Sequence, residues 1–161
     1  GGCSVTDLEA LLAEIIAHPE EDTPRMAYAD CLEEQGAGRD AQFIRDQIAG
    51  VFRAVPRSAV VPLEPLLGLC VGRRPDGGIV TCRGSVVFRR GFADEVTCTA
   101  EDWLAHGKDA RRLHPITRVN LATEPDDRVA LLVAFPGVAF TLPEPFRPVA
   151  AALEQITGRR A

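Results

Sequence analysis

The sequence has 161 residues, which suits one domain, and its 46% hydrophobic and 25% charged residues are typical of a globular chain. These fractions exclude a collagen-like, coiled-coil or intrinsically disordered protein. The net charge is -5, with 11 acidic residues and 3 Arg in residues 1–50 (3 − 11 = -8), so the rest of the chain sums to +3.

The beginning of the chain predicts two short amphipathic helices. Thr6-Asp7-Leu8-Glu9 has the pattern of a capping box, so we expect the first helix to begin there and to stop before Pro19. A second helix is expected to begin with Thr23 as N-cap and Pro24 as its first residue. Gly36 is a suitable left-handed C-terminal residue for this helix.

A third helix is predicted from about Asp40 to Phe52, with Phe43, Ile44 and Phe52 on its apolar face. Residues 1–54 therefore read as a helical unit, and residues 55–78, which are rich in Pro, as a connector with one short helix from about residue 63. The turn signal Pro75-Asp76-Gly77-Gly78 closes that connector.

Residues 79–161 predict an α/β portion packed with the helical unit as one domain. Residues 79–82, 85–88 and 92–98 form a predicted antiparallel meander. Thr99 caps the next helix, which carries Trp103, Leu104, Ala110 and Leu113 on its apolar side. The region 116–158 then reads strand, helix, strand, helix, a pattern that favours parallel strands and also resembles a degenerate pair of leucine-rich-type repeats. The expected fold class is α+β.

Three ordered segments carry a family resemblance. They are residues 11–19, the run Tyr28-Ala29-Asp30-Cys31-Leu32-Glu33-Glu34 with its flanks, and Gln42-Phe43-Ile44-Arg45-Asp46-Gln47. Together they resemble the bacterial repeat-companion domain family, with a looser match at residues 88–97 and 113–119. The resemblance implies an accessory interaction module that often precedes leucine-rich-type repeats, and it implies no activity. Cys31 stands where the family usually has Trp, and the chain holds at most two repeat-like units.

The polar residues of the matched segments allow two interpretations. Tyr28, Asp30, Glu33, Glu34 and Arg45 could form an acidic partner-binding face. They could instead form an inter-helix network in which Arg45 pairs with Asp30 or Glu34, and we favour this second interpretation.

The five cysteines are odd in number and show no tight spacing, so we expect free thiols in a reducing cytoplasm. A metal- or thiol-dependent site from Cys70, Cys82 and Cys98 with His106 or His114 is a weaker alternative, because the spacing is not that of a zinc site and Cys is often simply buried. We assign no metal, cofactor or catalytic residue. No apolar run is long enough to cross a bilayer, and the first residues lack a basic-then-apolar pattern, so we do not expect secretion.

Four Arg-Arg pairs, at residues 73–74, 89–90, 111–112 and 159–160, offer phosphate anchors. Few aromatic residues accompany them and the chain is acidic overall, so nucleic-acid binding is an alternative that we rank second. The leading expectation is a non-enzymatic protein–protein interaction module that binds another protein or itself.

Overall fold

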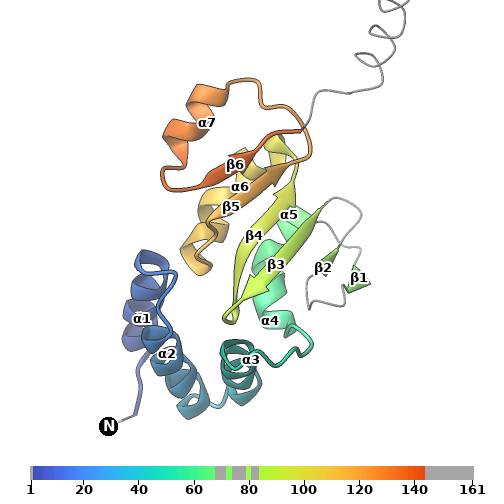
Figure 1. The fold of residues 1–161 in the computed structure, drawn as a ribbon. Helices are drawn as coiled ribbons and strands as arrows, with labels where there is room; N and C mark the ends of the chain where they lie inside the picture. The colour runs from blue at the N-terminus through green and yellow to red at the C-terminus, as the bar shows by residue number, and fades with distance from the viewer. Residues whose placement is uncertain (1, 68–71, 74–78, 81–83, 144–161) are drawn as a thin grey trace, which may run out of the picture.

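The computed structural model describes residues 2–67, 72–73, 79–80 and 84–143. Helices α1 to α3 gather at one end of a mixed sheet, at the end where strands β3 and β4 turn, and α7 lies toward the opposite end (Figure 1). Helices α4, α5 and α6 lie on one face of the sheet (Figure 1). The predicted α+β class is confirmed, with three helices first and a sheet interleaved with helices after them.

The helical elements follow the chain order of the prediction. They are α1 (Val5–Ala17), α2 (Thr23–Glu34), α3 (Gly38–Ile48), α4 (Arg57–Val60), the 3-10 turn η1 (Val61–Leu63), α5 (Glu64–Leu67), α6 (Ala100–Leu113) and α7 (Arg128–Ala134). None of the helices in the described part of the chain has the length and apolar character needed to cross a membrane.

The sheet keeps its strands in sequence order. They are β1 (Gly72–Arg73), β2 (Ile79–Val80), β3 (Ser85–Arg89), β4 (Phe92–Cys98), β5 (Arg118–Leu121) and β6 (Ala139–Thr141). Strands β1 to β4 pair antiparallel, which confirms the meander, whereas β4, β5 and β6 pair parallel. Parallel neighbours need a crossover, and α6 and α7 supply it. The predicted helix at 146–156 lies outside the described residues.

Several predicted boundaries are corrected. The capping box of α1 is formed by Ser4 and Asp7, and not by Thr6 and Glu9, because the Ser4 hydroxyl accepts the Asp7 amide proton while Asp7 accepts the Ser4 amide proton. Thr23 is the first residue of α2 and not its N-cap. Gly36 does adopt the left-handed conformation expected of it, with φ +83°.

The third helix is shorter than predicted. α3 ends at Ile48, and Phe52 follows it with 71% of its surface exposed. Gly50 has φ +75°, a left-handed conformation that ends the helix, so Phe52 cannot share a helical face with Ile44. On α6, Trp103 and Ala110 are buried as predicted, but Leu104 and Leu113 are exposed.

The predicted connector contributes to the core. Leu63, Leu66 and Leu67 on η1 and α5 are buried in the main apolar cluster, which also contains Trp103. A second, smaller cluster lies beneath the first three helices and comprises Ile15, Ala29, Ala41, Ile44 and Phe92. Because Phe92 belongs to β4, the smaller cluster already joins the helical unit to the sheet.

Candidate functional site

The polar residues of the Tyr28–Glu34 segment hold helices together. Arg45 on α3 reaches α2, with its Nη2 2.6 Å from Asp30 Oδ1 and 2.7 Å from Glu33 Oε2. Glu34 accepts the Cys3 amide proton at 2.7 Å. The inter-helix network with Arg45 and Asp30 is therefore confirmed, although Glu33 rather than Glu34 is the second partner.

The turn between β3 and β4 docks on the helical unit. Arg90 and Gly91 both have positive φ, +52° and +86°, as a tight hairpin turn requires. The Gly91 amide donates to Gln47 Oε1 at 2.8 Å. A Cβ on Gly91 would lie 2.5 Å from Ile44 Cγ1, so only glycine allows this close approach.

Arg90 continues this contact toward the loop between α1 and α2. Its Nη1 donates to the carbonyl oxygen of Glu20 at 2.8 Å and lies 3.0 Å from Glu20 Oε2. Its Nε lies 3.2 Å from Asp22 Oδ1. Two residues after Arg90, the Phe92 ring packs edge-on against Tyr28, with the ring centroids 5.7 Å apart. The Arg-Gly-Phe run thus fixes the helical unit to the sheet.

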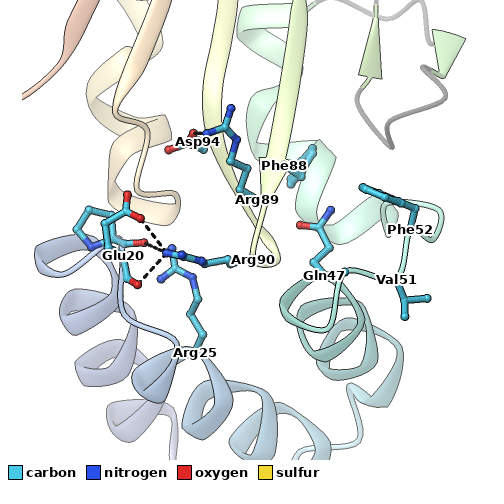
Figure 2. Close-up of a pocket in the computed structure, with 11 residues that line it drawn as sticks. Glu20, Arg25, Gln47, Val51, Phe52, Phe88, Arg89, Arg90 and Asp94 are labelled. Carbon is cyan, nitrogen blue, oxygen red and sulfur yellow. Dashed lines mark hydrogen bonds and ion pairs between the residues drawn. The ribbon is translucent and has the colours of Figure 1, made fainter.

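Beside this contact lies a cavity of about 290 Å³ (Figure 2). Glu20 and Arg25 line it from the α1–α2 loop and α2, and Gln47 lines it from α3. The hairpin contributes Arg89 and Arg90. Pro19, Gly50, Val51, Phe52, Phe88 and Asp94 complete the lining. The cavity therefore has charged walls on the side of Arg90 and an apolar rim on the side of Phe52.

Asp94 ties the hairpin to the neighbouring strand at the edge of this cavity. The Thr117 hydroxyl donates to Asp94 Oδ1 at 2.8 Å. Asp94 Oδ2 lies 3.4 Å from Arg89 Nη1 and 3.6 Å from Arg118 Nη2. Both contacts are ion pairs without a hydrogen bond. The two guanidinium groups therefore offset the negative charge of the carboxylate, but they do not satisfy Asp94 Oδ2 as a hydrogen-bond acceptor.

The imidazole and thiol that sequence analysis paired do not meet. His114 is buried, and its Nδ1 accepts the Ala93 amide proton at 3.2 Å near the start of β4. Cys98 is buried at the other end of that strand. It follows Ala93 by five residues, which places the two residues about 16 Å apart at 3.3 Å per residue. Cys70 and Cys82 lie outside the described residues, and His106 is exposed on α6. No cluster of metal-binding side chains occurs in the described ranges.

His114 and Cys98 both lie in surroundings typical of a protein core. Burial lowers the pKa of His114 to about 4, against the opposing effect of a hydrogen bond with the Ala59 backbone. The imidazole also packs edge-on against Phe88 and Phe92 at 6.1 Å. Burial and the negative charge of Asp102 raise the pKa of the Cys98 thiol to about 12, which is the opposite of the shift that activates a nucleophilic cysteine.

The expectation of five free thiols is wrong. Cys3 and Cys31 form a disulfide, with their Cα atoms 5.3 Å apart. The start of α1 meets the end of α2, and the Cys3 amide bonded to Glu34 holds it there. An odd number of cysteines does not exclude one disulfide, and a separation of 28 residues between two cysteines does not indicate that they pair. Because structural disulfides are rare in reducing compartments, the cysteines no longer argue for a cytoplasmic location.

The Arg-Arg pairs in the described part of the chain carry internal contacts. Arg89 and Arg90 bind Asp94, Glu20 and Asp22 as given above. Arg111 donates to the Pro136 carbonyl oxygen at 3.4 Å, and Arg112 lies 3.5 Å from Asp109. Arg74 and the pair at 159–160 lie outside the described residues.

Helix α7 exposes an apolar surface that the sequence did not indicate. Val129, Leu132 and Val133 are 70%, 56% and 75% exposed, whereas Leu131 and Phe135 of the same segment are buried. The continuous apolar run at residues 129–135 signalled a helix without indicating which face would be covered. β6, next along the chain, is the last strand of the sheet among the described strands.

Comparison with known protein families, with curated proteins and with solved structures finds no match to this chain.

Proposed function

We propose that this chain is a non-catalytic protein–protein interaction module that binds through the exposed face of α7 and the outer edge of β6. The resemblance of residues 11–47 to the bacterial repeat-companion domain family supports an accessory role of this kind. We also propose that the chain belongs to this bacterial family and that the segment from β5 onward resembles leucine-rich-type repeats.

The exposure of Val129, Leu132 and Val133 is the observation that carries the proposal. Isolated exposed apolar residues are ordinary, but these three stand at i, i+3 and i+4 on one helix and so form a continuous stripe. Burying such a stripe against a partner removes apolar surface from water, which is the main driving force of association.

The neighbouring strand edge adds a second mode of contact. β6 ends the order of described strands, so its outer edge offers backbone donors and acceptors to another strand. Every copy of the chain presents the same edge and the same stripe. Two copies related by a two-fold axis would pair their β6 strands antiparallel, so a second copy is the partner to test first.

The experiment is analytical ultracentrifugation of the wild type, of Val133→Glu and of Val5→Glu. Val5 is the matched control because it is a 66% exposed valine on α1. We expect the wild type and Val5→Glu to dimerise and Val133→Glu to dissociate about tenfold more readily. If the wild type is monomeric, columns carrying wild type and Val133→Glu are compared for retained partners, and equal retention by both would overturn the proposed surface.

A further inference from the structure

The cavity beside the hairpin turn is lined by a buried cation, Arg25, that forms no direct ion pair with any described residue. Arg25 is only 2% exposed, and its Nη1 donates to the carbonyl oxygen of Glu21 at 3.2 Å. Its guanidinium carbon lies 5.5 Å from the centre of the Phe92 ring. Its Nε is buried without a hydrogen-bond partner, and no carboxylate of the described residues forms an ion pair with it.

The three carboxylates whose charges act on Arg25 pair with other arginines, although Asp94 Oδ2 makes no hydrogen bond. Glu20 and Asp22 both bind Arg90, and the Asp94 carboxylate lies between Arg89 and Arg118. Burial and the positive charge of Arg90 lower the pKa of Arg25, and the negative charges of Asp22, Glu20 and Asp94 offset this effect only in part. A buried charge with an unsatisfied donor is costly, and folded proteins normally pair it.

The cavity lies beside the Arg25 side chain. Figure 2 shows the Arg25 side chain rising from α2 toward Arg90, with Phe52 and Val51 across the cavity. Its lining holds three arginines and two acidic residues, a net charge of 3 − 2 = +1. Its volume of about 290 Å³ is close to the lower limit for small-molecule sites.

We propose that this cavity binds a small molecule with one carboxylate or phosphate group, which pairs with the Arg25 guanidinium, and with an apolar part that contacts Phe52. A guanidinium offers donors in a planar fork that matches both oxyanions, and such charge-assisted hydrogen bonds are the strong ones. The Gln47 side-chain amide also lines the cavity, and its Oε1 already accepts the Gly91 amide proton. This site is independent of the α7 surface proposed above.

The test is a titration of the isotopically labelled protein with inorganic phosphate and, separately, with benzoate, followed by NMR at constant ionic strength set with chloride. We expect a saturable shift of the Arg25 Nε–H signal and of the amides of Gly50 and Phe52. Tighter binding of benzoate would assign a carboxylate ligand with an apolar part, and tighter binding of phosphate a phosphate ligand. Shifts that never saturate, or that chloride reproduces, would overturn the proposal.

Substitutions at the exposed rim of the cavity test anion binding without the risk of unfolding the chain. Arg25→Met removes the buried charge, but it also removes the contact with Phe92 and can unfold the chain. Phe52 is 71% exposed, so Phe52→Asp and Phe52→Lys both remove its ring and differ from each other mainly in the charge at the cavity mouth. We expect Phe52→Asp to bind phosphate about tenfold more weakly than Phe52→Lys does, because the two variants place opposite charges at the same position. Equal affinities for these two variants would contradict an anion site, and Arg112→Met on α6 is the control for unspecific loss of positive charge.

Discussion

The close approach of Gly91 to Ile44 gives a sharp prediction for the interface between the helices and the sheet. In Gly91→Ala the new Cβ would lie 2.5 Å from Ile44 Cγ1 and 2.8 Å from Ile44 Cα. The second of these atoms is backbone, so α3 or the turn must move. A residue with φ +86° is also strained by about 1–2 kcal/mol when it is not glycine.

The two effects are separated by a matched control. Gly36 has φ +83°, and a Cβ added there would meet no atom within 4 Å. Gly36→Ala therefore carries only the backbone strain, about 1–2 kcal/mol. Gly91→Ala carries the same strain and an overpacking cost of about 1–3 kcal/mol. We expect Gly91→Ala to lower the free energy of unfolding by about 3 kcal/mol, clearly more than the control.

Urea unfolding followed by fluorescence measures both losses. Trp103 is the single tryptophan and is fully buried, so its emission reports the unfolding of the sheet. The free energies follow from linear extrapolation of the transition. Equal losses for Gly91→Ala and Gly36→Ala would show that the hairpin turn does not press on α3, and the described docking would be refuted.

Three further predictions concern buried and cross-linked groups. The folded pKa of His114 is about 4 and its unfolded value 6.5, so unfolding takes up a proton between these pH values and the free energy of unfolding should fall by about 3 kcal/mol from pH 7 to 4. Urea titrations across that range should show a flatter dependence for His114→Gln, and an unchanged slope would contradict a buried neutral imidazole. Reduction of the Cys3–Cys31 disulfide, or Cys3→Ser, should cost about 3–4 kcal/mol for a loop of this length, with unreduced peptide mapping to confirm the pair, and identical melting with and without reductant would argue against it. Arg45→Met should cost less than about 1 kcal/mol, because Asp30 and Glu33 are largely exposed, and a larger loss in thermal unfolding would mean that the pair is shielded from water.

Local signals in the sequence predicted most elements of the fold. Thr99 caps α6 as expected, with its hydroxyl accepting the Asp102 amide proton, and His114-Pro115 follows its end. Parallel pairing of β5 and β6 followed from the strand–helix–strand order. These successes depend on patterns within a few residues. The N-terminus of α1 was misplaced because Ser4 and Thr6 are both good caps and each has an acidic residue three positions on.

The candidate site was less accessible to sequence reasoning because its contacts are long-range. Arg45 could be paired with Asp30 since both lie on predicted neighbouring helices. Nothing near Arg90 indicates that it binds Glu20, 70 residues earlier. The buried position of Arg25 likewise depends on Phe92, which comes from another part of the chain.

The docking of the hairpin turn also has a consequence for the order of events during synthesis. Helices α1 to α3 leave the ribosome before the sheet and contact one another through neighbouring segments, so they can form early. The side of Ile44 that receives Gly91, and the side of Tyr28 that receives Phe92, have no cover until residue 92 has emerged. The nascent helical unit therefore exposes an apolar face for the time needed to translate about 40 more residues at roughly 5–20 residues per second, which is a window of several seconds in which a chaperone can bind it.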